Sequence, residues 1–195
     1  VGKFGKSILK ENLNINYRDL LNFRNLYLSK IISLAKNHKY ITDKMPSNFL
    51  HLGLITTLFP KSKIIHVKRN PHSTCWANFK SYFVSNEIGY CYDLSDIVKY
   101  FKLYQNLMNF WKDHINTLNF YELDYELLTN NQETEIKKLI NYLDLNWEDS
   151  CLEPHLNQRP IETASKMQVR KKIYSGSANE WLKYKPYLNN IFDEL

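Results

Sequence analysis

Apolar and polar residues along the chain follow two different periods, which predicts that helices and strands alternate. Apolar side chains recur at helical spacing in residues 17–37 and in residues 47–59, where Ser47 is the predicted N-cap and Pro60 the predicted stop. Further helices are predicted at 71–84, 94–114, 131–143 and 178–194, the last interrupted by Pro186. Short β-branched or aromatic runs, typical of strands, occupy 40–43, 64–67 and 118–125.

Strands that alternate with helices form βαβ units, so the predicted fold class is α/β with a mostly parallel sheet. We expect 40–43, 63–68 and 118–123 to be neighbouring parallel strands, with helices on both faces of the sheet. Ligands of such sheets bind at the carboxyl ends of the strands. The three predicted strands end in Asp43-Lys44, in Lys68-Arg69 and in the stretch from Tyr121 to Tyr125. A binding site is therefore expected at this edge.

The stretch IIHVKRNPHSTCWANF, residues 64–79, joins a predicted buried strand to a helix. Asn70 is a favourable N-cap and Pro71 a favourable first helical residue. A helix N-terminus attracts anions, and the planar guanidinium of Arg69 suits a phosphate. The junction is consistent with half of a phosphate site. Equally, Arg69 can pair with a surface carboxylate, and the local pattern leaves both interpretations open.

Composition narrows the class of protein without naming a function. The chain has 195 residues and a net charge of +6, which suits an anionic ligand or a solvated basic surface. The basic residues stand at strand ends rather than in one stripe, which argues against a nucleic-acid module. Three scattered cysteines without CxxC spacing favour neither a disulfide framework nor a zinc site, and the histidines show no metal-ligand pairing, so no metal is expected.

Residues 1–195 are predicted to form a single, incomplete domain. No apolar run is long enough to span a membrane, and the first residues do not form a signal peptide. A cytoplasmic location is the default expectation. The chain opens on Val1 rather than Met, and we interpret it as a fragment. The stretch GKFGKS, residues 2–7, has only two residues between its glycines where a P-loop needs four, which argues against a Walker A motif.

Residues 41–75, ITDKMPSNFLHLGLITTLFPKSKIIHVKRNPHSTC, resemble the sulfotransferase superfamily. They look most like the bacterial branch that is often fused to tetratricopeptide repeats and is related to the tyrosylprotein sulfotransferases. LDYELL, residues 123–128, is similar to the strand-end Tyr-Glu motif of these enzymes. ETASKMQVRKKIYSGSANEWLKY, residues 162–184, resembles their C-terminal segment that closes over the cofactor.

The resemblance implies a three-layer fold akin to the P-loop nucleotide kinases. It implies transfer of a sulfuryl group from 3′-phosphoadenosine 5′-phosphosulfate (PAPS) to a hydroxyl, without a metal. Residue by residue, it implies two catalytic positions and a set of cofactor-binding positions. Lys44 matches the lysine that neutralises the transferring group, Ser165 a serine close to the phosphosulfate, Arg69 the arginine on the 3′-phosphate, Tyr125 a tyrosine near the nucleotide, and Arg170, Lys171 and Lys172 the closing segment.

The sequence departs from the family pattern in three respects. The glycine-rich phosphosulfate loop with its strand, and the acidic base that usually follows, are not found in it, and we expect a truncated chain that is inactive by itself. The serine expected eight residues after Arg69 is Ala77, although Ser73 and Thr74 are near. Glu180 stands before the C-terminal tryptophan where a basic residue is usual, and its carboxylate would repel a phosphate unless it points away.

The predicted function is therefore a PAPS-dependent sulfotransferase whose acceptor is a hydroxyl, with peptide tyrosine, a carbohydrate and a small alcohol all open. The alternative is a degenerate, non-catalytic relative that binds an anion or a partner protein. A P-loop kinase fragment is disfavoured, because Asp43 followed by Lys44-Met45-Pro46 does not resemble a metal-binding aspartate after a strand.

Overall fold

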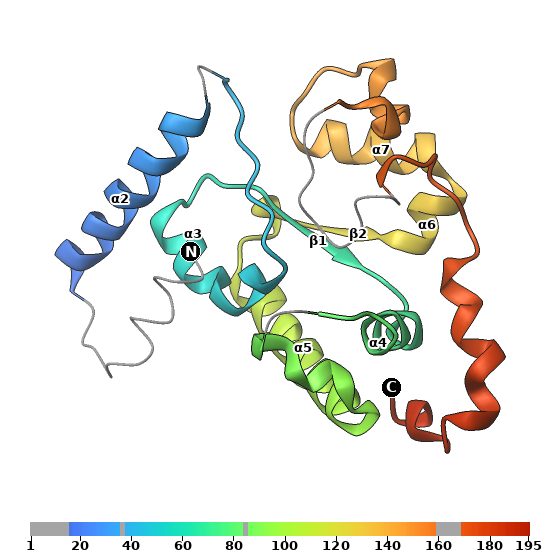
Figure 1. The fold of residues 1–195 in the computed structure, drawn as a ribbon. Coiled ribbons are helices and arrows are strands. Elements are labelled where there is room, and N and C mark those ends of the chain that lie inside the picture. The colour runs from blue at the N-terminus through green and yellow to red at the C-terminus, as the bar shows by residue number, and fades with distance from the viewer. Residues whose placement is uncertain (1–15, 36–37, 84–85, 159–168) are drawn as a thin grey trace. The chain divides into compact units, whose positions relative to one another are not determined.

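The computed structural model describes residues 16–35, 38–83, 86–158 and 169–195 (Figure 1). The chain divides into two compact units, Val1–Ser62 with Leu107–Asn119, and Lys63–Asn106 with Phe120–Leu195. The α-helices are α2 (Tyr17–Ala35), α3 (Leu52–Leu58), α4 (Pro71–Phe79), α5 (Leu94–His114), α6 (Tyr125–Asn130) and α7 (Gln132–Tyr142). The strands are β1 (Ile64–Lys68) and β2 (Phe120–Asp124). The 3₁₀ segments are η1 (Pro46–His51), η2 (Asn86–Tyr92), η3 (Thr117–Asn119), η4 (Asp149–Leu152), η5 (Pro154–Leu156), η6 (Ser177–Tyr187) and η7 (Ile191–Glu194).

The first unit is held together by side chains that reach backbone carbonyls. Arg24 of α2 donates from Nε to the Leu58 carbonyl at 3.2 Å, which fastens α2 to the end of α3. The Trp111 indole N–H donates to the Phe49 carbonyl at 2.8 Å. The same indole lies against Gly53 so closely that a Cβ built there would meet its ring carbons at 2.8 and 3.0 Å. Gly53 is therefore the residue that lets α3 approach this tryptophan.

Two sequence predictions for this unit are wrong. Residues 40–43 are not a strand: Tyr40 and Ile41 are about half exposed, and no described segment pairs with them. β-propensity alone cannot form a strand, because an extended segment is stable only when a neighbour takes its hydrogen bonds. Ser47 does not cap a continuous helix either, since Pro46 starts a 3₁₀ turn after Met45, and α3 begins only at Leu52.

The second unit is built on a parallel pair of strands. β1 pairs with β2 in the register Ile64↔Phe120 to Lys68↔Asp124, which confirms two of the three predicted parallel strands. Helices contact both faces. On one, Tyr104 of α5 meets His66 of β1; on the other, the rings of Tyr121 and Tyr142 of α7 lie 4.8 Å apart. The described sheet is small and parallel; a kinase-like fold with a further strand stays a prediction.

The run Ile64–Val67 is only partly buried, contrary to expectation. Ile65 is 39% and Val67 53% exposed, whereas Leu123, the partner of Val67 in the register, is 5% exposed. The reason is that α7 covers β2 on this face: it packs on Tyr121 and leaves the β1 side chains beside it uncovered. A β-branched run indicates a strand, but burial depends on what lies over it.

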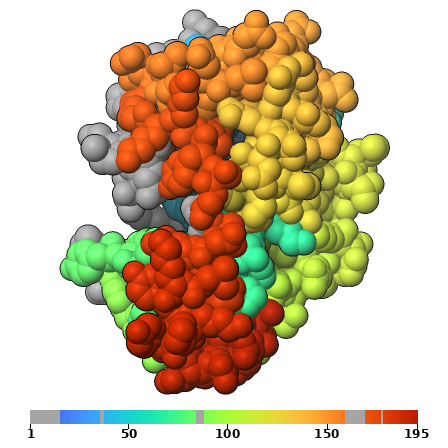
Figure 2. All heavy atoms as spheres, turned by 90° about the vertical axis from the view of Figure 1, so that its right-hand side faces the viewer, coloured from blue at the N-terminus to red at the C-terminus, as the bar shows by residue number. Residues whose placement is uncertain are grey.

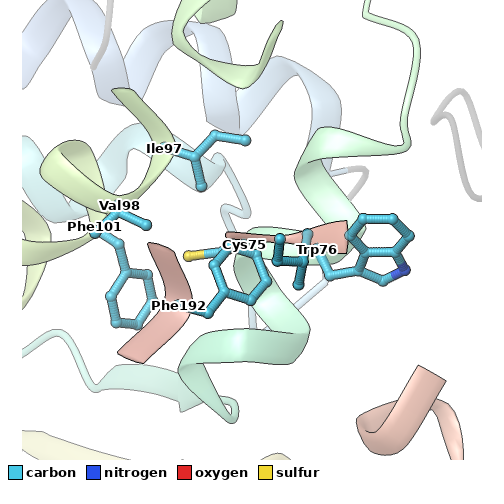
Figure 3. Close-up of a cluster of buried hydrophobic side chains, with 7 residues drawn as sticks. Cys75, Trp76, Ile97, Val98, Phe101 and Phe192 are labelled. Atoms are coloured by element: carbon cyan, nitrogen blue, oxygen red, sulfur yellow. The ribbon is translucent and has the colours of Figure 1, made fainter. Parts of the chain in front are cut away.

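The core of the second unit joins α4, α5 and the C-terminal segments. Cys75 and Trp76 of α4, Ile97, Val98 and Phe101 of α5, and Leu188 and Phe192 near the C-terminus form one buried cluster (Figure 3). η6 packs along α4, with Trp76 and Tyr184 stacked at 4.4 Å.

Three further boundaries differ from the prediction in this unit. α4 ends at Phe79 rather than 84, and β2 covers 120–124 rather than 118–125. The helix predicted at 178–194 is two 3₁₀ segments, separated at Asn189 and Asn190, which both have positive φ. Pro186, which cannot donate a backbone hydrogen bond, lies within the first of them.

Candidate anion-binding site

Arg69 and Tyr125 come together although they lie far apart in the sequence. Arg69 directly follows β1 and Tyr125 directly follows β2, and the two strands are parallel and adjacent. The guanidinium carbon of Arg69 lies 5.1 Å from the centre of the Tyr125 ring. Both side chains are half-buried, so the ring supports the cation while leaving it within reach of solvent. This places a permanent positive charge at the carboxyl edge of the sheet, where ligands of such folds bind.

The N-terminus of α4 is capped by two separate segments. The Asn70 side chain accepts from the Ser73 N–H at 3.0 Å, as the sequence predicted. The Asn70 N–H itself donates to the carboxylate of Glu126, at 3.1 Å from Oε1 and 3.2 Å from Oε2. Glu126 was not among the predicted site residues. Pro71 has no N–H to donate. The His72 N–H is therefore the one backbone donor in this turn that has no acceptor within the described chain.

The hydroxyls that stand near the family's missing serine are engaged within the protein. Ser73 is buried and donates to the Ala178 carbonyl of η6, while Thr74 donates to the Asn70 carbonyl at 3.0 Å. Ala77 occupies the expected serine position, and its carbonyl accepts from Ser81 at 2.6 Å. Ser73 and Thr74 therefore fasten the α4 turn, and their hydrogens are not directed at a ligand.

The carboxylate of Glu180 is paired. It accepts from Lys80, which follows α4, so the pair carries no net charge. Trp181, the next residue, stacks on His72 of α4 with ring centres 4.5 Å apart, which seats η6 against the start of α4. An open hollow beside this contact is lined by Tyr174, Gly176, Asn179, Glu180 and Lys183. The expected repulsion of a phosphate by Glu180 is thus offset by Lys80.

A polar network lies along the strands that lead to the site. Lys68 is 3.6 Å from one oxygen of Glu122, and His66 Nδ1 is 3.3 Å from the other. His66 Nε2 shares a hydrogen bond with the Tyr104 hydroxyl. Burial, and then the charge of Glu122, raise the pKa of Tyr104 to about 12, so this hydroxyl stays protonated near neutral pH. Lys68, the last residue of β1, is thus paired within the sheet, whereas Arg69, the next residue, lies over the Tyr125 ring.

Lys44 lies in the first unit and is exposed. Its neighbour Asp43 accepts a hydrogen bond from the Tyr27 hydroxyl of α2 at 2.6 Å. Burial, that hydrogen bond and the charge of Asp43 together raise the pKa of Tyr27 above its usual value, so its hydroxyl stays protonated near neutral pH. Lys44 therefore extends from an irregular segment that is bonded to α2 through Asp43, the residue before it.

The remaining predicted residues lie in the C-terminal segment. Arg170, Lys171 and Lys172 are described and exposed, whereas Ser165 lies outside the described residues. Both ribbon and space-filling views show residues 169–176 passing beside α6, the helix that begins at Tyr125 (Figures 1 and 2). Their convergence with Arg69 on one ligand stays a prediction.

Arg69 and the His72 N–H lie where β1 leads into α4, and both are donors whose chemistry suits an anionic group. Among the described residues no cluster of three His, Cys, Asp or Glu side chains could hold a metal, and no helix is long and apolar enough to cross a membrane. The described part of the chain thus combines helices with a small parallel sheet. The model of the family described as "Sulfotransferase family" matches residues 9–149, and the chain belongs to this family.

Two other proteins are similar to this chain. An uncharacterized protein of Aquifex aeolicus (strain VF5) is 35% identical over 197 residues, which cover 100% of this chain and 26% of that protein. The chain thus spans about a quarter of the length of this relative. A solved structure described as the sulfotransferase domain from the curacin biosynthetic pathway has a TM-score of 0.51 at 17% identity, over 87% of this chain and 60% of that one. The likeness to it shows a sulfotransferase-like fold.

Proposed function

We propose that this chain forms the donor-binding part of a sulfotransferase that takes a sulfuryl group from PAPS and gives it to a hydroxyl acceptor. The observation that carries the proposal is the Arg69–Tyr125 pair at the carboxyl ends of two parallel strands. A guanidinium held over an aromatic ring is pre-organised, so it loses little side-chain entropy when it binds a phosphate. In this proposal Arg69 binds the 3′-phosphate and Tyr125 lies near the nucleotide.

The chemistry requires little of the protein beyond position and charge. In the transfer, the bond between sulfur and the oxygen it shares with phosphorus breaks, and a new bond forms between sulfur and the acceptor oxygen. The acceptor hydroxyl gives up its proton to a general base, and the leaving phosphate oxygen keeps the electron pair. Negative charge therefore builds on that leaving oxygen and on the peripheral oxygens of the sulfuryl group, as in phosphoryl transfer.

Fixed cations stabilise such charge most effectively, because they need no reorganisation during the reaction. Lys44 is proposed to supply one ammonium group at the sulfuryl oxygens, and Ser165 a hydroxyl close to the phosphosulfate. Arg170, Lys171 and Lys172 would add positive charge on the exposed segment beside α6. By resemblance to the tyrosylprotein branch, the tyrosine of a peptide is the first acceptor to test.

A specific observation favours a second candidate, a non-catalytic domain that binds an anion. Glu126 already presents a carboxylate to the Asn70 N–H at the start of α4, and the Ser73 and Thr74 hydroxyls donate to backbone carbonyls. The site then offers an anion fewer donors than a complete phosphate cradle would. Binding of the nucleotide without any transfer from PAPS would support this candidate.

Calorimetric titration with 3′,5′-adenosine bisphosphate, the donor without its sulfate, tests the proposal. We expect Arg69→Ala to weaken binding about tenfold to a hundredfold, the scale of one charge-assisted contact. Arg69→Lys should recover only part of this, because an ammonium lacks the planar fork. The matched control is Arg18→Ala, which removes the same charge from the exposed surface of α2 and should bind as the wild type does. Equal affinities for Arg69→Ala and wild type would remove Arg69 from the site.

A further inference from the structure

We propose that Glu126 is a positioning residue for the anion site: by holding the Asn70 N–H it fixes the main chain from which Arg69 extends. The proposal rests on the function proposed above and adds a residue to that site. Both carboxylate oxygens lie within hydrogen-bond distance of one amide, 3.1 and 3.2 Å from Asn70 N. A carboxylate that accepts from a backbone N–H forms one of the stronger hydrogen bonds in proteins.

The held amide belongs to the peptide unit that joins Arg69 to Asn70. A peptide unit is planar, so fixing its N–H restricts the rotation of the whole unit and with it the Cα of Arg69. Tyr125, the neighbour of Glu126 in the chain, supports the guanidinium of the same arginine at 5.1 Å. The dipeptide Tyr125-Glu126 therefore holds Arg69 at two points, one on its side chain and one on its main chain.

The hydrogen bonds of Asn70 and Glu126 form a helix capping box whose two halves come from different segments. In a capping box the N-cap side chain accepts from the N3 amide, and a Glu at N3 accepts from the N-cap amide. Here Asn70 accepts from Ser73, which occupies N3 and cannot return the bond with a long carboxylate. Glu126 supplies the missing half from the start of α6, 56 residues away. Helix α4 and helix α6 are thereby fixed to each other at the point where both strands end.

The charge of Glu126 cannot itself favour an anion, because a carboxylate near a phosphate repels it. A positioning role and a charge role therefore predict opposite results for Glu126→Ala: loss of the bond to Asn70 weakens binding, whereas loss of a repelling charge alone would strengthen it. In Glu126→Gln the amide oxygen can still accept from Asn70 while the charge is gone. Glu126→Asp makes the complementary change: it keeps the charge but withdraws the oxygens by one carbon–carbon bond, about 1.5 Å. The bond to Asn70 is then too long to form.

The experiment combines nucleotide titration with amide hydrogen exchange measured by NMR. We expect Glu126→Ala and Glu126→Asp to weaken binding of 3′,5′-adenosine bisphosphate by roughly tenfold or more, the scale of a displaced binding group. Glu126→Gln should bind as tightly as wild type or more tightly. The control is Glu133→Ala, which removes an exposed carboxylate of α7 that pairs with Lys137, and it should leave binding unchanged. Wild-type affinity in Glu126→Asp, or a loss in Glu126→Gln equal to that in Glu126→Ala, would overturn the proposal.

Hydrogen exchange provides a readout that needs no ligand. The Asn70 amide should exchange faster in Glu126→Asp than in wild type or Glu126→Gln, and the Arg69 Nε resonance should shift in the same variant, while the Leu123 amide of β2 keeps its protection. If the wild-type chain fails to bind the nucleotide, the proposed function fails, but these two signals still decide whether Glu126 positions Arg69. Unchanged Asn70 exchange and an unchanged Arg69 resonance in Glu126→Asp would refute the inference on their own.

Discussion

Gly53→Ala should destabilise the first unit even though alanine favours helices. Gly53 is the second residue of α3, and an added Cβ would lie 2.8 and 3.0 Å from two ring carbons of Trp111. Such contacts are shorter than van der Waals distance, so either α3 or the indole must move. The indole is not free to move, because its N–H is bonded to the Phe49 carbonyl at 2.8 Å. The methyl group therefore meets a ring that is held in place.

Two opposing terms set the magnitude. Replacing a helical glycine by alanine gains at most about 1 kcal/mol in helix propensity, and less near a helix end. Overpacking a close contact costs about 1–3 kcal/mol. The difference is a net loss of about 1–2 kcal/mol, because Gly53 lies in the first turn of α3, where the propensity gain is smallest. For a chain of this length the loss corresponds to a decrease in Tm of about 2–8 °C.

Thermal unfolding followed by circular dichroism measures this effect. The control is Gly89→Ala in η2, where an added Cβ meets nothing within 4 Å and no decrease in Tm is expected. The decisive arm is a double-mutant cycle with Trp111→Phe, which removes the two crowded ring carbons. In that background the cost of Gly53→Ala should shrink towards zero. A Tm for Gly53→Ala at or above that of wild type, or an equal cost in both backgrounds, would refute the reasoning.

Three more outcomes follow from the site and the buried thiols. In preparations that transfer radiolabelled sulfate from PAPS, Lys44→Ala should lower the rate roughly a hundredfold and Lys44→Arg should recover little, whereas Lys39→Ala should match wild type; an active Lys44→Ala enzyme would exclude Lys44 from catalysis. A thiol reagent at pH 8 should label Cys151 first and reach Cys75 and Cys91 only after unfolding, because both are 1% exposed; prompt labelling of Cys75 would contradict this. Burial and then Cys91 raise the pKa of Cys75 from 9.0 to about 12, so the unfolded chain loses this proton first and stability should fall as pH rises from 9 to 12; Cys75→Ala, compared with Cys151→Ala as control, should flatten that slope in chemical denaturation.

Local signals predicted the elements whose causes are local. The amphipathic period of residues 94–114 corresponds to α5 with the same bounds, and Asn70-Pro71 caps and opens α4 as the residue types require. The pairing of residues 63–68 with 118–123 also followed, because a short βα alternation leaves parallel neighbours as the natural arrangement. The meeting of Arg69 with Tyr125 is a direct result of that pairing.

What the sequence could not reveal depends on partners far away along the chain. The run at 40–43 has strand-forming residues, but Asp43 is bonded to Tyr27 and no described strand lies beside the run. Glu126 was overlooked because its partner is a backbone amide, and main-chain donors leave no trace in a sequence. Two signals were present. Glu126 belongs to the Tyr-Glu motif of residues 123–128, and Asn70 has Ser73 rather than Glu at N3, so the N-cap amide had to find an acceptor elsewhere.

The parallel pairing of β1 with β2 also has a consequence for the order of events during synthesis. Residues that meet across this pair, such as Asn70 and Glu126, are 56 positions apart. At ordinary translation rates the ribosome needs about 3–11 s to add that many residues. For those seconds the apolar Ile64–Val67 segment has been made but its partner strand has not, and an unpaired strand of this kind invites association with other chains. The nascent polypeptide is therefore most exposed to aggregation, and most in need of a chaperone, between the emergence of Arg69 and that of Tyr125.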